Sequence, residues 1–138
     1  MKPADGLVKL TRQAVSFGGV GVVGFIVDAT VFTVSNVILQ NLYWSRAVSY
    51  LAAVTTTWFL NRKLTFGASG RNVVHEWGRF AVTQLGGGAV NYGVYAWLVA
   101  SFELFYRMPV AAIAVGSLAG MAANFAAAKF LVFNQRKD

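Results

Sequence analysis

Long runs of apolar residues alternate with short polar segments along this chain. Four runs approach or exceed the roughly 20 residues that cross the hydrocarbon core of a membrane as a helix. They lie at 14–39, 47–60, 80–102 and 109–133. The second run is the shortest, and we expect its helix to continue through Asn61, Arg62 and Lys63, because long cationic side chains can reach the interface. The pattern predicts an all-α membrane protein with four transmembrane helices.

Composition supports this prediction. The chain has 138 residues, of which 57% are hydrophobic and only 12% charged, about half the charged fraction of a soluble domain. A net charge of +7 would suggest nucleic acid in a soluble protein, but the basic residues flank apolar runs and form no folded basic face, so we expect no nucleic-acid partner. With no cysteine and a single histidine, we expect neither a metal site nor another cofactor.

The distribution of the cations predicts an orientation. Ten of the twelve Lys and Arg residues lie near the two termini or in and beside the middle loop, 67–78, whereas the connections 40–46 and 103–108 hold only Arg46 and Arg107. The positive-inside rule therefore predicts that both termini and the middle loop are cytoplasmic. Aromatic residues near the expected helix ends suit an interfacial belt; they are Tyr43, Trp44, Trp58, Phe66, Trp77, Phe105, Tyr106 and Phe133.

The two halves of the chain resemble each other. An offset of 63 pairs helix one with helix three, and an offset of 67 pairs helix two with helix four. The matched pairs include Phe17 with Phe80, Gly24 with Gly87, Asp28 with Asn91, Thr57 with Asn124, Arg62 with Lys129 and Phe66 with Phe133. We expect one transmembrane domain, 1–138, built from two parallel two-helix repeats at about 14–66 and 79–133. A chance match between apolar helices is the alternative.

Asp28 is the candidate for chemistry inside the membrane. It lies near the middle of the first run, where an acidic residue costs about 2.5–3.5 kcal/mol on translocon scales. Small residues such as Gly24 share its helix face, and the matching face of the third helix carries Gln84 and Asn91. Two interpretations remain open: a polar site for substrate hydroxyls or a proton, and a structural carboxylate bonded to neighbouring helices.

Basic residues close the second and fourth helices. The first cluster is Asn61-Arg62-Lys63, and Lys129 holds the equivalent place. Such cations can bind a lipid phosphate, Arg by a bidentate fork and Lys as a point charge, or they can simply fix topology. Amides this close to the hydrocarbon, Asn61 and Asn124, need partners and can bond to an anion or a sugar.

The remaining motifs give less information about function. Gly116 and Gly120 form a GxxxG pattern that suits either close packing within the bundle or a homodimer face. His75 and Glu76 are interpreted as a solvated polar pair. Neither a nucleotide-binding loop nor a nucleophile motif is found, and the five acidic residues form no catalytic pair, so we do not expect an enzyme.

Together these elements resemble the GtrA-like membrane proteins of bacterial cell-surface polysaccharide synthesis. The resemblance covers nearly the whole chain and rests on an ordered set of motifs. They are Phe17-x-x-x-Gly21-x-x-Gly24-Phe25-x-x-Asp28 with Phe32, Ser49-Tyr50, Asn61-Arg62-Lys63-x-Thr65-Phe66, Arg79-Phe80 with Gly87 and Asn91, and Asn124-Phe125 through Lys129 to Val132-Phe133. The chain departs from it at Thr57-Trp58, where many relatives have an Asn-Phe pair.

The resemblance implies a protein of the bacterial inner membrane that moves a polyprenyl-phosphate-linked sugar to the outer leaflet, where a separate membrane glycosyltransferase uses it. The expected phosphate-binding residues are Arg62, Lys63, Lys129, Asn61, Arg12 and Arg79. The expected intramembrane lining is Asp28, Gln84, Asn91, Asn124 and Tyr50.

Two other functions stay open. One is a membrane anchor that holds a glycosyltransferase through its glycine-rich helix faces. The other is a small multidrug-type proton-coupled exporter, although the strong charge asymmetry argues against the dual topology of such proteins. A homodimer is compatible with each of these functions, because four helices make a thin bundle.

Overall fold

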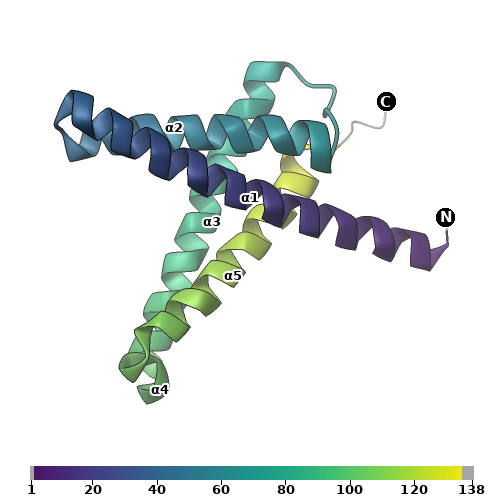
Figure 1. Cartoon of the computed structure of the whole chain (residues 1–138). Helices are drawn as coiled ribbons and strands as arrows, with labels where there is room; N and C mark the ends of the chain where they lie inside the picture. The colour runs from purple at the N-terminus through teal and green to yellow at the C-terminus, as the bar shows by residue number, and fades with distance from the viewer. Residues whose placement is uncertain (1, 135–138) are drawn as a thin grey trace. The chain divides into compact units, whose positions relative to one another are not determined.

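The computed structural model describes residues 2–134, and all regular structure within them is helical, which confirms the all-α prediction (Figure 1). The elements are α1 (Pro3–Leu39), α2 (Leu42–Leu60), η1 (Asn61–Thr65), α3 (Val73–Ser101), α4 (Glu103–Arg107), α5 (Pro109–Ala127) and η2 (Ala128–Val132). The two η elements are π-helical turns that continue α2 and α5. The side chain of Tyr43, predicted in the aromatic belt, lies outside the described residues.

The chain forms two compact units. Unit 1 ends at Trp77, and unit 2 is Gly78–Asn134. Helix α3 begins in unit 1 and continues into unit 2.

Unit 1 is a helical hairpin in which α1 and α2 lie side by side (Figure 1). Helix α1 ends because Gln40 adopts a left-handed conformation, with φ of 48°, and donates its backbone N–H to Asn36. Asn41 then begins α2, since its Oδ1 accepts the backbone N–H of Trp44 at 3.1 Å. The connection is thus shorter than the predicted 40–46, and Arg46 lies inside a helix.

Small side chains bring the two helices of unit 1 together. A Cβ atom on Gly24 would overlap the methyl group of Thr57, so only glycine allows this approach. The Thr57 hydroxyl meanwhile donates to Ala53 O at 2.9 Å within its own helix, which leaves the methyl group to face α1. Nearer the other end, the rings of Phe17 and Phe66 lie 6.1 Å apart.

Unit 2 packs α3 against α5. A Cβ atom on Gly87 would overlap the side chain of Asn124, and one on Gly120 would lie 2.7 Å from Gly87 O. One on Gly116 would lie 2.6 Å from Asn91 O. Both glycines of the GxxxG pattern therefore serve packing within the unit, one of the two predicted alternatives.

The same contacts occur at matched positions in both units. Phe80 and Phe133 lie 6.0 Å apart with their ring planes at 59°, the interplanar angle also found between Phe17 and Phe66. The π-helical turns match as well: Phe66 donates to Asn61 O at 2.9 Å, and Phe133 donates to Ala128 O at 2.8 Å.

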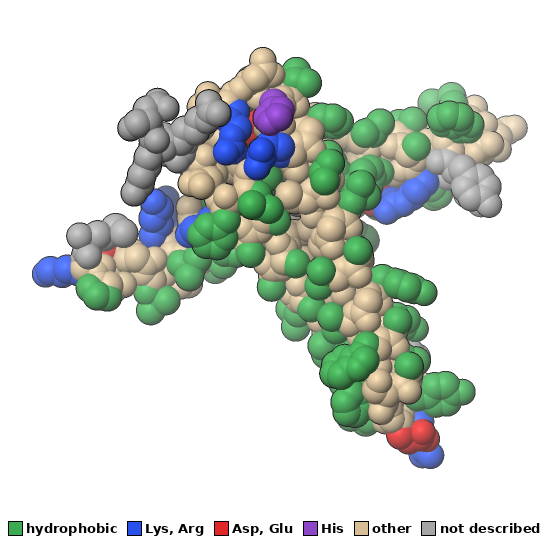
Figure 2. All heavy atoms as spheres, turned by 180° about the vertical axis from the view of Figure 1, so that it is seen from behind, with side chains coloured by type: hydrophobic (Ala, Val, Ile, Leu, Met, Phe, Trp, Pro, Cys, Tyr) green, Lys and Arg blue, Asp and Glu red, His purple; other side chains and the backbone are tan. Residues whose placement is uncertain are grey.

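Two helices in the described part of the chain are long and apolar enough to cross a membrane, Pro3–Leu39 and Ala114–Val132. Figure 2 shows hydrophobic side chains spread along the outside of the helices. Large ones such as Phe25 and Val37 are almost three-quarters exposed. Surfaces of this kind suit contact with lipid rather than water.

Several predicted boundaries and environments were wrong. Helix α1 begins at Pro3 rather than near residue 14, and α3 begins at Val73, which shortens the middle loop. Of the predicted belt, Trp58 and Phe133 are buried inside their units, because each has a specific partner there: Glu76 for Trp58 and Phe80 for Phe133.

Candidate functional site

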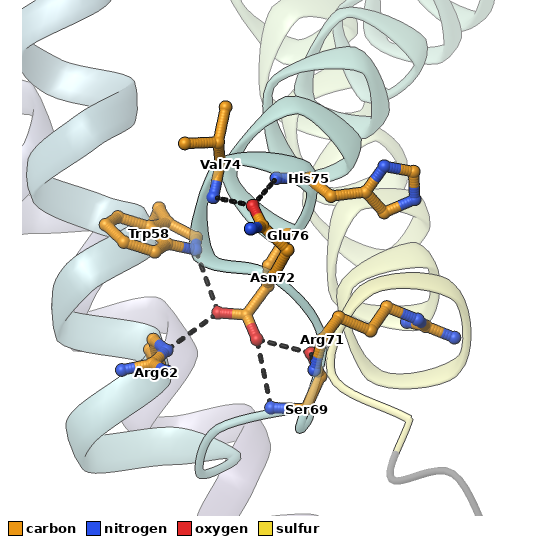
Figure 3. Close-up of polar contacts among 8 residues, drawn as sticks. All are labelled: Trp58, Arg62, Ser69, Arg71, Asn72, Val74, His75 and Glu76. Carbon is orange, nitrogen blue, oxygen red and sulfur yellow. Dashed lines mark hydrogen bonds and ion pairs between the residues drawn. The ribbon is translucent and has the colours of Figure 1, made fainter.

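A fully buried carboxylate organises one end of unit 1 (Figure 3). Glu76 Oε1 accepts hydrogen bonds from Trp58 Nε1 and from Arg62 Nε, both at 3.0 Å. Its Oε2 accepts the backbone N–H of Ser69 at 2.9 Å and a short hydrogen bond from the Ser69 hydroxyl. Four donors, one of them the cation Arg62, compensate the desolvation of this charge. The prediction that Glu76 is solvated was therefore wrong, whereas His75 is exposed as predicted.

The loop before α3 has the conformation that this cluster requires. Gly67 and Gly70 have φ of 82° and 77°, a region that favours glycine, and they flank Ser69. Asn72 then starts the helix, since its Oδ1 accepts the N–H groups of Val74 and His75 (Figure 3). Glu76 follows in the first turn and points back to the loop.

The bond to Glu76 fixes how Arg62 is presented. Only Nε of Arg62 is used, so its terminal nitrogens, Nη1 and Nη2, have no partner among residues 2–134. The guanidinium carbon lies 6.0 Å from the centre of the Trp58 ring, and the side chain remains 29% exposed. A guanidinium held in this way offers two parallel N–H donors, the geometry that matches a phosphate.

The neighbours of Arg62 are polar too. Lys63 is exposed, with its Nζ 4.6 Å from the centre of the Phe59 ring. Asn61 is buried, and its Oδ1 has no hydrogen-bond partner within the described residues. All three lie on the π-helical turn η1, and such turns are frequent at functional sites.

The other predicted phosphate ligands lie on separate elements. Arg12 is exposed on α1, one helical turn before Ser16, whose hydroxyl bonds to Thr65 of η1 at 2.7 Å. In unit 2, Arg79 Nε donates to Leu131 O at 3.0 Å, which brings Arg79 next to the turn η2 that carries Lys129. Each unit thus has cations beside its π-helical turn.

Asp28 has a partner that the sequence interpretation did not include. Arg46 Nη1 donates to both carboxylate oxygens of Asp28 at 2.6 Å and lies 3.4 Å from Ser49 Oγ. The Asp28 side chain is 23% exposed and that of Arg46 is 58% exposed. Since Asp28 lies within a helix apolar enough to span a membrane, an ion pair is a favourable state for its charge.

The remaining intramembrane candidates are amides and a phenol. Gln84 Nε2, Asn124 Oδ1 and the Tyr50 hydroxyl are buried without a hydrogen-bond partner in the described part of the chain. Asn91 lies against Gly116 and Gly120 of α5. Unpaired buried polar atoms are uncommon in proteins, so each of them can accept a ligand or a water.

Two residues of these sites, Glu76 and Arg46, were missed by the sequence analysis. Each is the counter-charge of a predicted residue. Glu76 follows Arg62 by 14 residues, and Arg46 follows Asp28 by 18. Asp28 and Arg62 each need a counter-charge in apolar surroundings, and this requirement is the signal that could have indicated Arg46 and Glu76.

Comparison with known families identifies the fold family. A family model described as "GtrA/DPMS, transmembrane domain" matches residues 16–137. The chain belongs to this family. The match confirms the GtrA-like resemblance and, with the apolar helices, establishes a membrane protein. No curated protein and no solved structure matches this GtrA/DPMS domain.

Proposed function

We propose that this GtrA/DPMS domain moves a polyprenyl-phosphate-linked sugar from the cytoplasmic to the outer leaflet of a bacterial inner membrane. The observation that carries the proposal is the guanidinium of Arg62, held by Glu76 with two terminal nitrogens available. A lipid phosphate is the ligand that such a fork fits best at a membrane surface. The family description supports a role with membrane lipids.

Polar partners for the sugar are the second requirement. Within the described residues, buried atoms without a hydrogen-bond partner occur in each unit: the acceptor Asn61 Oδ1 in unit 1, and the donor Gln84 Nε2 and the acceptor Asn124 Oδ1 in unit 2. Sugar hydroxyls both donate and accept, so they can satisfy atoms of either kind. The prenyl tail needs no polar partner and would remain in lipid.

The proposed architecture has four spans in two parallel repeats. Helix α2 has 19 residues and is continued by η1, and α3 has 29, so both reach the roughly 20 residues that a span needs. The recurrence of the Phe17–Phe66 contact as Phe80–Phe133 supports a duplicated hairpin.

The proposed orientation places both termini and the middle loop in the cytoplasm. Ten of the twelve Lys and Arg residues lie on that side in this arrangement, and the opposite side has only Arg46, near the start of α2, and Arg107, in α4. This asymmetry of Lys and Arg supports the orientation.

In this proposal the chain is a transporter and not an enzyme. A separate membrane glycosyltransferase would consume the sugar lipid in the outer leaflet, and that consumption would set the direction of net flux. Among residues 2–134, no group of three or more His, Cys, Asp or Glu side chains could hold a metal ion.

The test is translocation of a radiolabelled polyprenyl-phosphate-glucose in proteoliposomes, with the unmodified protein, Asp28→Ala, Arg62→Ala and, as a control for lost charge, Lys9→Ala, which changes an exposed residue near the start of α1. We expect transport by the unmodified protein and by Lys9→Ala, and strong loss in the other two. Absence of transport by the unmodified protein at confirmed incorporation contradicts the proposal.

An anchor for a glycosyltransferase is the second candidate. Gly18 and Gly21 favour it, because a Cβ atom on either would meet nothing within 4 Å in the described part of the chain, so a partner helix could approach closely. In this case the protein would co-purify with a membrane glycosyltransferase, Gly21→Leu would break the complex, and the proteoliposome assay would show no transport.

A further inference from the structure

We propose that Glu76 is a positioning residue for a phosphate site at Arg62: it binds Nε and thereby presents Nη1 and Nη2 to a phosphate monoester or diester. This inference deepens the proposed function and rests on its phosphate ligand. From the sequence alone, Glu76 would not be assigned to a phosphate site, because a negative charge is expected to repel the ligand. The assignment comes from the contacts within unit 1.

Contacts from several directions hold the Glu76 carboxylate in place. Glu76 is fully buried and bonded to three different residues, Trp58, Arg62 and Ser69. Its two oxygens are therefore fixed by the indole and the loop backbone even when Arg62 is absent. A side chain held from several directions can orient a fourth group without itself moving.

The bond to Glu76 restricts the Arg62 side chain before any ligand binds. An unrestrained Arg side chain loses rotamer freedom when it binds a ligand, at a cost that weakens binding. Glu76 removes most of that freedom beforehand, because the bond at Nε directs the opposite edge of the planar guanidinium away from the carboxylate. That edge has no partner among residues 2–134, and 29% of the side chain remains exposed, so a ligand can reach it.

The turn η1 places a second cation, Lys63, beside Arg62. Lys63 is exposed directly after Arg62, so it adds a mobile positive charge to a site whose own pair, Arg62 with Glu76, is neutral. Two roles follow: Arg62 supplies geometry, and Lys63 supplies net attraction. A single net positive charge favours a ligand that binds and can later leave, as a transporter requires.

Glu76 could affect phosphate binding in two opposite ways, by repelling the ligand or by positioning Arg62. The direction in which Glu76→Gln changes the affinity distinguishes them. If Glu76 acts mainly as a repelling charge, Glu76→Gln tightens phosphate binding. If it positions Arg62, the same change weakens binding, because an amide NH₂ cannot accept the bonds that Ser69 donates to Oε2 and the side chain loses its fixed orientation. We expect weakening of about five- to tenfold, the scale of ordering one arginine side chain.

The experiment is a ³¹P NMR titration of farnesyl phosphate against the full chain in phosphatidylcholine nanodiscs. Inorganic phosphate and farnesol are titrated in parallel. Inorganic phosphate tests whether a free phosphate is sufficient for binding, and farnesol tests whether the prenyl group binds without a phosphate. Four proteins form a cycle: the unmodified chain, Arg62→Lys, Glu76→Gln and the double variant. Lys9→Ala is the control for a lost surface charge.

We expect farnesyl phosphate to bind more tightly than inorganic phosphate, and farnesol to show no competition. If Glu76 acts through Arg62, the double variant binds as weakly as Arg62→Lys alone, so the two effects do not add. The Arg62 Nε–H resonance, recorded with ¹⁵N-arginine, should be protected from exchange in the unmodified chain and lose its protection in Glu76→Gln. Additive effects, tighter binding by Glu76→Gln, or failure of the unmodified chain to bind phosphate overturns the proposal.

A variant that keeps the charge covers the case in which Glu76→Gln does not fold. Ser69→Ala removes one donor to Oε2 and retains both the carboxylate and Arg62. The positioning role predicts weaker binding by about two- to threefold, the lower end of the cost of an ordered side chain. Unchanged binding in a folded Ser69→Ala overturns it. Binding is measured without transport, so a chain that binds phosphate through this site but moves no lipid supports the inference and contradicts the proposed function.

Discussion

The contact between Gly24 and Thr57 allows a stability prediction with a matched control. Gly24→Ala adds a methyl group that would overlap the Thr57 methyl group, whereas Gly21→Ala, one turn earlier on α1, adds one that meets nothing within 4 Å. Overpacking of this kind costs about 1–3 kcal/mol. Replacing an unhindered helical glycine by alanine gains about 0.5–1 kcal/mol. Both variants share this gain, so Gly24→Ala should be less stable than Gly21→Ala by about 1–3 kcal/mol in the free energy of unfolding.

The assay is reversible unfolding in mixed detergent micelles, followed by the loss of helical circular dichroism. Thr57→Ser provides the rescue, because serine keeps the hydroxyl that bonds to Ala53 O but lacks the methyl group. Gly24→Ala combined with Thr57→Ser should recover most of the stability lost by Gly24→Ala alone. If Gly24→Ala and Gly21→Ala unfold within about 0.5 kcal/mol of each other, the ordinary range for surface changes, the packing argument is wrong.

Two further predictions concern charge and orientation. Arg46→Gln and Asp28→Asn should each destabilise the chain, and the double variant should be more stable than the sum of the two effects predicts. Thermal unfolding should give a coupling free energy of about 0.5–3 kcal/mol, and additive effects would show that the two side chains are not energetically coupled. The chain has no cysteine, so Ala68→Cys and Gln40→Cys give single labelling sites. A membrane-impermeant maleimide should modify only the cysteine at 40 in intact spheroplasts and only that at 68 in inverted vesicles, and modification of both from one side would exclude the proposed topology.

The sequence predicted helices well because their signal is local. An apolar run of membrane-spanning length can be recognised within one segment of the sequence, without knowledge of the tertiary structure. The helix ends were predicted less accurately. Helix α1 begins at Pro3, well before its apolar run at 14–39, so the residues that precede the run are helical too. Hydropathy detects where lipid begins and not where backbone hydrogen bonding begins.

The sites were predicted only in part, for a different reason. Arg62 and Asp28 stood out as charges in apolar surroundings, but their partners did not, since Glu76 and Arg46 are in segments predicted as solvated connections. Pairing depends on the hairpin turn and on the loop at Gly67 and Gly70, which set distances between residues far apart in the chain. Periodicity carries no information about such distances, whereas the requirement that a buried charge be neutralised does.

The two units differ in a way that follows from this requirement. Under the proposed duplication, Asp28 corresponds to Asn91 at an offset of 63, and Arg46 corresponds to an isoleucine, Ile113, at an offset of 67. Both members of the ion pair are therefore replaced by neutral residues in unit 2, and neither charge is left alone. Joint replacement is expected if Asp28 and Arg46 act as one element, because losing either alone would leave an unpaired charge within a membrane span. The packing contact, by contrast, occurs in both units, as Gly24 with Thr57 and Gly87 with Asn124. The hairpin is thus the shared structural unit, and the ion pair of unit 1 is an addition to it. Removing one partner should destabilise the chain by leaving a lone charge, and removing both should restore part of that stability.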